Sequence, residues 1–203
     1  MAISSIILAG GKSSRFGQNK FLETIGNKTL IQRVVDCVAL LGSEIIIVTA
    51  RGEVVPCSSS VEMKTVGDVY PEKGPLGGIY SGLIRASNPQ AVVVGSDMPF
   101  INVELLRYMH RISHAFDAVV PRIQDKVEPL CAIYSKKCCS VMQELLEQNE
   151  LRINRLFDVV KVRYVSENEI NRFDPEHLSF FNINTRADLG EAREIAARQA
   201  GEA

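Results

Sequence analysis

The sequence predicts a three-layer α/β fold with a mostly parallel central sheet. Short runs rich in Val and Ile alternate along the chain with amphipathic helical patterns, and this alternation is typical of βαβ units. Two of the runs, Ile45–Val48 and Val92–Val94, are continuously apolar. Such strands are covered on both faces, as in a parallel sheet with a helical layer on each side.

Predicted strands and helices follow one another through the first two thirds of the chain. The helical signal is clear where Leu30, Val34, Val38 and Leu41 fall on one face. Strands are expected at Ser4–Ala9, Glu44–Thr49, Val61–Val66, Ala91–Gly95 and Ala118–Val120. Helices are expected at Thr29–Leu41, Leu76–Ala86, Val103–His114 and Lys136–Gln148.

The last third is less regular. Three further strands are expected, at Pro129–Tyr134, Val159–Val165 and Leu178–Ile183. Thr185–Asp188 then has the spacing of a capping box, which predicts a helix to about Gln199.

Length and composition indicate one domain spanning residues 1–203. The chain is 46% apolar and 23% charged, which are ordinary values for a domain that buries a core. Its net charge of −1 provides no bulk attraction to nucleic acid or to a membrane surface. Any binding of phosphate must therefore come from locally placed cations.

The cysteines and the N-terminus indicate a cytoplasmic protein. Five cysteines without a C-x-x-C pair fit neither a zinc framework nor a secreted disulfide scaffold. The N-terminus has no basic segment followed by a signal-peptide core. No stretch approaches the ~20 apolar residues of a membrane span.

A glycine-rich, cationic loop, Gly10–Lys20, follows the first predicted strand. Glycines allow a backbone to approach a ligand closely, and Lys12, Arg15 and Lys20 add positive charge. The loop therefore fits a ligand with several negative charges, such as a nucleoside triphosphate. An ordinary strand-to-helix loop with surface cations is the alternative.

This loop matches neither of two familiar phosphate-binding motifs. A P-loop needs a glycine five positions before Gly11, where Ile6 stands. The dinucleotide fingerprint G-x-G-x-x-G fails because Gly10 and Gly11 are adjacent and Lys12 follows. The loop therefore belongs to a third kind of nucleotide site or to none.

Polar side chains follow several predicted strands, at the edge where α/β sheets bind ligands. Asp97 follows a buried strand, and magnesium binds one or two carboxylates together with phosphate oxygens; a helix N-cap is the equal alternative. Asp68 could bind a nucleobase or ribose, or satisfy a turn. Asn182 and Asn184 follow the late strand.

A second glycine loop, Lys73–Gly78, precedes a predicted helix. Free N–H groups at a helix N-terminus can bind an anion or a base edge. A rigid Gly-Pro turn is the alternative.

Other polar residues give weaker signals. Arg152 and Arg155 could face a second anionic substrate, although a solvated helix face is the commoner case. His110 and His114 have the spacing of zinc ligands, but the accompanying glutamate is absent. No pattern for a catalytic serine or cysteine triad occurs.

Five segments together resemble the motifs of nucleotidyltransferases and, more narrowly, of MobA-type molybdenum cofactor guanylyltransferases. Leu8–Lys20 resembles the signature L-A-G-G-x-x-x-R-M-G-x-x-K. The other matching segments, in the family's order, are Gly74–Gly78, Gly95–Phe100, Glu128–Leu130 and Phe181–Thr185. Together they span nearly the whole chain.

The resemblance implies a Rossmann-like nucleotidyltransferase fold that binds GTP with its N-terminal half and molybdopterin with its C-terminal half. It implies transfer of GMP from GTP to molybdopterin with release of pyrophosphate, and Mg²⁺ as cofactor. The implied protein partners are cofactor-biosynthesis proteins and molybdoenzyme chaperones.

The resemblance also assigns residues. Lys20, Arg15 and Asp97 are implied as catalytic, with Asp97 holding the metal, and Asn182 and Asn184 lie on the pterin side. The implied nucleotide-binding residues are Leu8, Ala9, Gly10, Gly11, Lys20, Asp68, Pro75, Leu76, Gly78 and Asp97.

The sequence departs from the family pattern at three places. Phe16 replaces the usual Met, which we expect to be tolerated. Val48–Ala50 lacks an Asn that some relatives place near the nucleotide, and the glycine often found ahead of Arg152 is missing. The pterin side is therefore less well defined than the GTP side.

Three alternative functions stay open. A CTP-dependent relative typically reads L-A-A-G, and Gly10 favours guanine because a methyl group there would crowd a purine. A sugar-phosphate nucleotidyltransferase is usually longer. A regulatory module that binds nucleotide without catalysis would not need Lys20 and Asp97.

Overall fold

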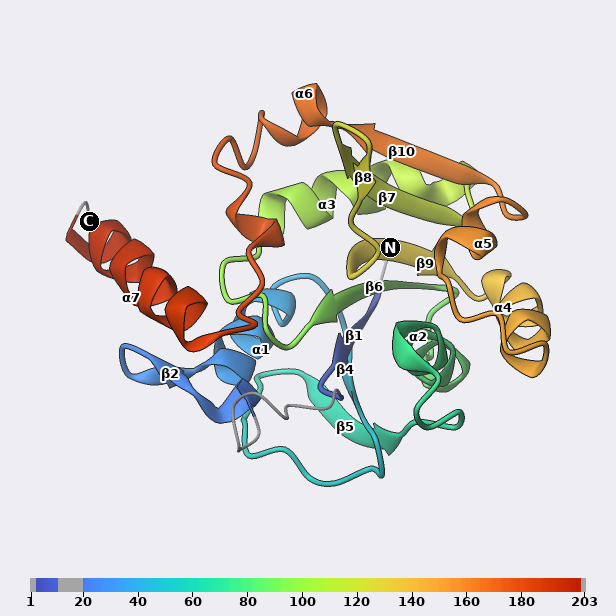
Figure 1. The fold of residues 1–203 in the computed structure, drawn as a ribbon, viewed down its shortest axis with the longest axis horizontal. Helices are drawn as coiled ribbons and strands as arrows, with labels where there is room; N and C mark the ends of the chain where they lie inside the picture. Colours follow the sequence, from blue (N-terminus) through green and yellow to red (C-terminus); the bar gives the residue numbers. More distant parts are fainter. Residues whose placement is uncertain (1–2, 11–19, 202–203) are drawn as a thin grey trace.

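The computed structural model describes residues 3–10 and 20–201. It confirms the α/β fold, with a twisted sheet between helices (Figure 1). The strand order is β10-β7-β9-β6-β1-β4-β5, with β8 paired to β7. The strands are β1 Ser4–Leu8, β4 Glu44–Thr49, β5 Glu62–Gly67, β6 Gln90–Gly95, β7 Ala118–Ile123, β8 Lys126–Val127, β9 Cys131–Ser135 and β10 Val162–Ser166, and a separate hairpin contains β2 Thr24–Ile25 and β3 Lys28–Thr29.

Four neighbouring strands, β6, β1, β4 and β5, run parallel. Leu8 pairs with both Val48 and Gly95, and Thr49 pairs with Gly67. The carboxyl ends of these strands therefore lie at one edge of the sheet. β9 is antiparallel to both of its neighbours, so the sheet is mixed although its centre is parallel.

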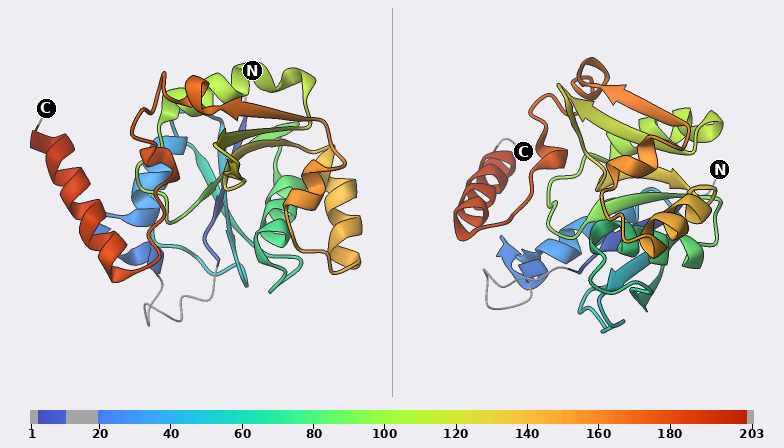
Figure 2. Two further views of the ribbon diagram at one scale, coloured as in Figure 1. Left: turned by 45° about the horizontal axis from the view of Figure 1, so that its top comes forward. Right: turned by 45° about the vertical axis from the view of Figure 1, so that its right-hand side comes forward.

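Helices cover both faces of the sheet (Figure 2). In β4, Ile45 and Ile47 face the core formed with α1 and α3, whereas Ile46 and Val48 face the core formed with α2, α4 and α5. This two-sided burial explains the continuously apolar strands. The α-helices are α1 Leu30–Val38, α2 Gly74–Arg85, α3 Val103–Ile112, α4 Cys138–Glu147, α5 Asn154–Phe157, α6 Glu167–Ile170 and α7 Arg186–Gly201, and the 3₁₀ helices are η1 Lys20–Leu22, η2 Ser113–Ala115 and η3 Leu178–Phe180.

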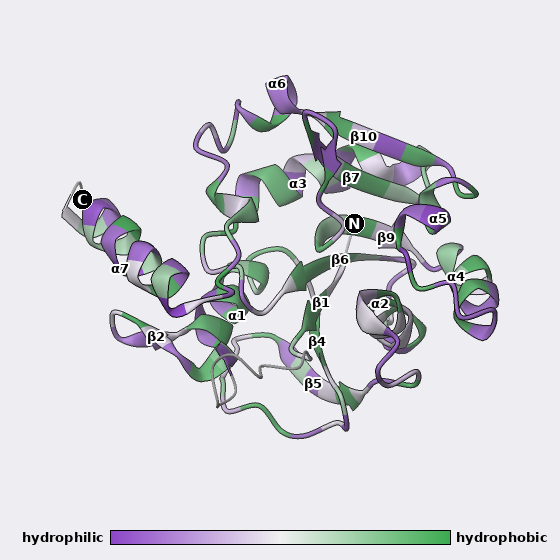
Figure 3. Ribbon diagram, viewed as in Figure 1, coloured by the Kyte–Doolittle hydropathy of each residue, from purple (hydrophilic) through white to green (hydrophobic). Residues whose placement is uncertain are grey.

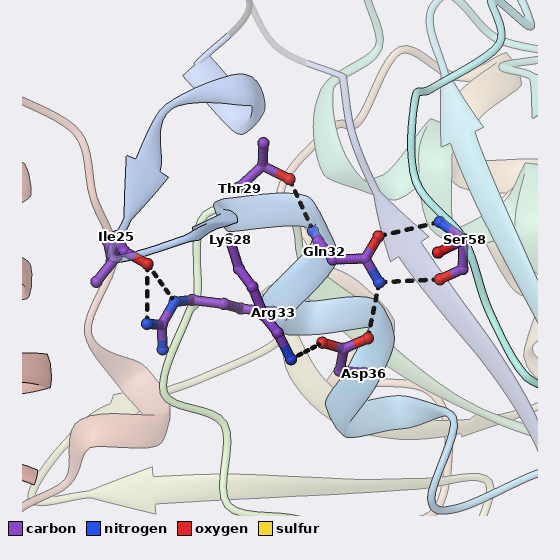
Figure 4. Close-up of polar contacts among 7 residues, drawn as sticks. All are labelled: Ile25, Lys28, Thr29, Gln32, Arg33, Asp36 and Ser58. Atoms are coloured by element: carbon purple, nitrogen blue, oxygen red, sulfur yellow. Dashed lines mark hydrogen bonds and ion pairs between the residues drawn. The ribbon is translucent and has the colours of Figure 1, made fainter. Parts of the chain in front are cut away.

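Helix α1 anchors the segments before and after it (Figure 4). Its N-cap Thr29 accepts a hydrogen bond from the Gln32 backbone N–H at 3.2 Å. The Gln32 side-chain amide exchanges two hydrogen bonds with the Ser58 backbone. Arg33 donates to the Ile25 carbonyl at 2.9 and 3.2 Å. The hairpin and the 50–60 loop are thereby fixed to one helix.

Helix α7 lies at the side of the molecule next to the β2–β3 hairpin (Figure 1). Hydropathy alternates along α7, whereas the central strands are consistently apolar (Figure 3). Its apolar side chains form a small third core with residues from other segments. The buried members of this third core are Ile25, Leu30, Ile183, Leu189 and Ala192, with Phe100, Phe181 and Ala196 packed against them.

The predicted strand at Leu178–Ile183 is wrong. Asp174 accepts hydrogen bonds from the backbone N–H groups of Leu178 and Ser179 at 3.0 and 2.8 Å, which turns the chain into η3. The apolar residues that follow pack into the third core instead of a sheet. The alternation of apolar and polar residues at the end of this segment therefore reflects burial against α7.

Within residues 3–10 and 20–201, no helix is long and apolar enough to cross a membrane.

Candidate functional site

The carboxyl edge of the parallel strands brings the end of β1 and the Asp97 segment together. The Ser96 backbone N–H donates to the Leu8 carbonyl at 3.1 Å, and the Ala9 N–H donates to the Val48 carbonyl at 2.9 Å. The backbone just before the glycine loop is therefore fixed between β4 and β6. Gly10 is exposed at this edge.

Lys20, Asp97 and Asn184 meet at this edge although they are far apart in sequence. Lys20 Nζ donates to Asp97 Oδ2 at 2.7 Å and to Asn184 Oδ1 at 3.2 Å. The side chains of Lys20 and Asp97 keep 20% and 21% of their surface exposed. The ion pair is therefore shielded from bulk water but accessible to a ligand.

Asp97 does not cap the helix that follows it. The N-cap of α3 is Asn102, whose side chain accepts from the backbone N–H groups of Glu104 and Leu105 at 2.9 and 3.1 Å. The N-cap alternative for Asp97 is thus wrong. Its carboxylate is directed to Lys20 instead.

The residues around Lys20 Nζ fit a hard divalent cation. Asp97 supplies a carboxylate oxygen and Asn184 an amide oxygen, and both already face one cationic group. Mg²⁺ prefers such oxygen ligands and binds few protein side chains when phosphates complete its coordination. In the described part of the chain, no group of three or more His, Cys, Asp or Glu side chains is placed to hold a metal by itself.

Asp68 is engaged by its own turn. Its Oδ1 accepts hydrogen bonds from the Tyr70 backbone N–H at 2.9 Å and from the Ser81 hydroxyl at 2.8 Å. These contacts fasten the end of β5 to α2. The turn alternative therefore accounts for this carboxylate, and a contact with the nucleotide stays a prediction.

The start of α2 packs closely on the sheet. A Cβ at Gly78 would lie 3.2 Å from Leu8 Cδ2, and a Cβ at Gly77 would lie 2.8 Å from the Tyr70 carbonyl oxygen. Leu76 is fully buried, so its contact with a nucleotide stays a prediction. These glycines thus have a packing role, and Pro75 occupies the first turn of the helix.

The other predicted site residues have different positions. Asn182 donates to the Phe180 carbonyl at 2.9 Å and does not join Lys20. Gly11 and Arg15 lie outside the described residues.

The remaining cations that could face a second substrate have other partners. Arg152 pairs with Glu150 at 2.8 Å, and Arg155 pairs with Asp158 at 3.3 Å. The rings of His110 and His114 lie 5.8 Å apart. A hollow of about 600 Å³ lies beside β5 and is lined by Lys64, Thr65, Val66, Gly67, Ile84 and Arg85. In the sheet, β1 and β4 lie between β5 and β6, the strand that Asp97 follows.

The sequence analysis missed how Asn184 is held. Asp188 Oδ2 accepts hydrogen bonds from the backbone N–H groups of Asn184 and Thr185 at 2.7 and 2.8 Å. The capping-box spacing of Thr185–Asp188 was the available signal. It predicted the helix start but not the link to the site.

Comparisons with known proteins match most of this chain to one family. Residues 5–162 match the MobA-like NTP transferase domain. A "Probable molybdenum cofactor guanylyltransferase" from Pelotomaculum thermopropionicum is 37% identical, with 95% of this chain and 93% of the relative covered. The "Molybdenum cofactor guanylyltransferase" of Desulfosudis oleivorans is 35% identical, with 98% of each chain covered.

A solved structure shares the fold of this chain. The crystal structure of molybdopterin-guanine dinucleotide biosynthesis protein A from Archaeoglobus fulgidus is 25% identical and has a TM-score of 0.80. The match covers 97% of this chain and 100% of the other. The chain therefore belongs to the family of MobA-like NTP transferase domains.

Proposed function

We propose that this protein transfers GMP from GTP to the terminal phosphate of molybdopterin, releasing pyrophosphate. The observation that carries the proposal is the meeting of Lys20, Asp97 and Asn184 at the carboxyl edge of the parallel strands. The proposal is supported by full-length relatives that bear the name molybdenum cofactor guanylyltransferase. Because the chain belongs to a nucleotidyltransferase family, the regulatory alternative without catalysis is disfavoured.

The reaction needs alignment and neutralisation of charge. An anionic phosphate oxygen of molybdopterin attacks the α-phosphorus of GTP, a new P–O bond forms, and the bond to the β-phosphate oxygen breaks. The nucleophile carries no proton that must be removed, so a general base is not required. Lys20 stabilises the charge that grows on the phosphate oxygens.

Asp97 would hold the divalent metal that this chemistry uses. A metal bound there would supply positive charge to the triphosphate and to the pyrophosphate leaving group. Lys20 Nζ now bonds the side chains of both Asp97 and Asn184, so we expect it to exchange Asp97 for phosphate oxygens when substrate binds and to keep its contact with Asn184. Magnesium is the proposed ion because its ligands in such sites are oxygens of carboxylate and phosphate.

The backbone beside Gly10 favours guanine over cytosine in this proposal. Among the described residues, a Cβ at Gly10 would meet no atom closer than the Ala50 backbone nitrogen at 3.8 Å. The fold itself therefore tolerates a methyl group, and glycine at this position leaves space for a purine. GTP is the proposed donor and CTP the alternative.

We propose that the strand ends of the N-terminal half bind GTP and that the Asn182–Asn184 segment binds molybdopterin. Gly11, Arg15, Asp68, Pro75 and Leu76 are kept as proposed nucleotide contacts, together with Gly78. Proteins of cofactor biosynthesis and molybdoenzyme chaperones are the proposed protein partners in the cytoplasm.

A labelled-nucleotide assay tests the proposed function. The purified protein is incubated with Mg²⁺, molybdopterin and either α-labelled GTP or α-labelled CTP, and the products are separated. We expect the label of GTP to appear in a pterin–guanine dinucleotide, with pyrophosphate released. Transfer from CTP would select the cytidylyl alternative, and no transfer from either nucleotide would contradict the proposal.

A further inference from the structure

The three site residues belong to segments that share the third core. A nearby apolar residue in each segment packs into this core. Ile25 lies five residues after Lys20, Phe100 lies three residues after Asp97, and Ile183 directly precedes Asn184. The helix supplies Leu189 and Ala192 to this core. The family match ends at residue 162, so Asn184 and α7 lie beyond it.

Asp188 fixes the backbone that carries Asn184. Its Oδ2 accepts the backbone N–H groups of Asn184 and Thr185 at 2.7 and 2.8 Å. The Thr185 hydroxyl accepts the Asp188 N–H in return at 3.1 Å. The hydrogen bonds from Asn184 and Thr185 outweigh the cost of burial and lower the pKa of the Asp188 carboxyl, and Lys20 also lowers it. Asp188 therefore stays ionised at neutral pH.

The backbone of this segment is also tied to Asp97. The Ile183 N–H donates to the Asp97 carbonyl at 3.0 Å, and the next residue, Asn184, accepts from Lys20 Nζ. With its N–H held by Asp188, Asn184 has its main chain restrained on both sides. Its amide oxygen is thereby aimed at Lys20.

The hairpin restrains Lys20 from the other direction. Arg193 of α7 donates to the Thr24 carbonyl at 3.1 Å. The Leu30 N–H donates to the Glu23 carbonyl at 2.9 Å, and the Glu23 N–H donates to the Lys20 carbonyl at 3.0 Å. Helix α7 thus contacts the segments that carry both Asn184 and Lys20.

The geometry points to Asp188 as a positioning residue for GMP transfer, acting through Asn184 on Lys20. This inference rests on the proposed function. Asp188 does not touch the reacting atoms; it holds the amide oxygen that orients the Lys20 ammonium beside Asp97. Displacement of a catalytic group by about 1 Å can cost up to about 10²-fold in rate.

Three variants separate positioning from helix capping. Asp188→Ala removes the acceptor for Asn184, and we expect kcat with GTP and molybdopterin to fall about tenfold. Asp188→Asn retains an oxygen acceptor, and we expect kcat within about twofold of the parent. The matched control Thr185→Ala removes the reciprocal cap bond but leaves the Asp188 grip on Asn184, so its kcat should equal the parent value.

Thermal unfolding of each variant is measured alongside kcat. If Asp188 only stabilised the helix, Asp188→Ala and Thr185→Ala would lower the melting temperature and both would keep the parent kcat. That result would overturn the inference.

A double-mutant cycle tests the path through Asn184. We expect Asp188→Ala to cause less than about a twofold further loss in the Asn184→Ala background, because residues that act as one unit are not additive. Equal fold-losses in both backgrounds would overturn the inference.

A crystal structure of Asp188→Ala decides the positioning role without relying on GMP transfer. We expect Lys20 Nζ and Asn184 Oδ1 to separate beyond hydrogen-bond distance while Lys20 keeps Asp97. An unchanged contact would overturn the inference. If the parent protein transferred no GMP, the proposed function would be wrong. The crystal structure of Asp188→Ala would still show whether Asp188 positions Asn184 beside Lys20.

Discussion

Two carboxylates at opposite edges of the same sheet have opposite surroundings. Glu44 begins β4 at the amino edge; its side chain is 5% exposed and accepts hydrogen bonds from Ser4, from Lys64, and from the backbone and hydroxyl of Ser87. Asp97 follows β6 at the carboxyl edge, is 21% exposed, and, among the described residues, bonds one cation, Lys20.

The difference separates a structural carboxylate from one that can bind a ligand. At Glu44, burial raises the pKa, but the hydrogen bonds of Ser4, Ser87 and Lys64 outweigh it and lower the pKa to about 2. Its oxygens are occupied by protein donors. Asp97 can exchange Lys20 for a metal without losing a network. We therefore expect loss of Glu44 to affect stability and loss of Asp97 to affect GMP transfer.

The largest effect is expected from Asp97→Ala. Removing the carboxylate takes away the proposed metal ligand and the partner of Lys20, so kcat should fall by more than about 10³-fold. The melting temperature should change little, because an ion pair between partly exposed side chains contributes only about 0–1 kcal/mol. Steady-state kinetics and calorimetry check both values. Parental turnover by Asp97→Ala would remove Asp97 from the mechanism.

Lys20→Ala comes next. It removes the cation proposed to stabilise the transition state, and kcat should fall by about 10²-fold, as for loss of one preorganised donor. Lys28→Ala, which breaks a surface pair with Asp36 at 2.6 Å, is the matched control and should keep the parent rate. Equal rates for the two variants would argue against a role for Lys20.

Glu44→Gln tests the other side of the comparison. The folded-state pKa of about 2 lies below the ordinary value of 4.5, so ionised Glu44 stabilises the fold above that ordinary value. The stabilisation, about 3 kcal/mol, is lost as the pH falls through about 2. We expect the variant to be less stable than the parent at pH 7, and the difference to shrink at acid pH. Denaturant titrations at several pH values measure it.

The same variant should keep the parent kcat below its unfolding temperature. A stability difference independent of pH would show that ionised Glu44 does not account for it. A large loss of kcat in the folded variant would show that Glu44, at the amino edge, also affects GMP transfer.

Gly10→Ala should have the smallest effect. In the part of the chain that the structure describes, a Cβ there meets only the Ala50 nitrogen at 3.8 Å, so we expect stability to be unchanged. One methyl group in a binding site typically changes discrimination by roughly tenfold or more, and we expect kcat/KM for GTP to fall about tenfold with that for CTP unaffected. Parallel assays with both nucleotides check this, and an equal loss for both would remove Gly10 from base selection.

The regular elements of the fold could be predicted from the sequence. Continuous apolar runs predicted β4 with its observed bounds, and helical periodicity predicted α1. The short strands β2, β3 and β8 were missed because two-residue strands carry no periodic signal. Leu178–Ile183 failed because the Asp174 side chain redirects the backbone, which sequence periodicity does not register.

The candidate site was predicted in part. Strand ends and the glycine loop indicated that Asp97 and Lys20 approach each other, and the structure confirms that contact. The engagement of Asp68 by Tyr70 and Ser81 depends on how α2 packs against β5. Likewise, the hydrogen bond from the Asn184 N–H to Asp188 connects the first turn of α7 to the candidate site. The contacts of Asp68 with Ser81 and of Asn184 with Lys20 are tertiary contacts, which local sequence does not register.

A structure of the protein with Mg²⁺ and a non-hydrolysable GTP analogue tests the central claim most directly. We predict the ion at about 2.0–2.1 Å from a carboxylate oxygen of Asp97, with Lys20 Nζ transferred to the phosphates and the guanine beside Gly10. A nucleotide bound elsewhere, such as in the hollow beside Lys64 and Arg85, with the Lys20–Asp97 pair intact, would contradict the account.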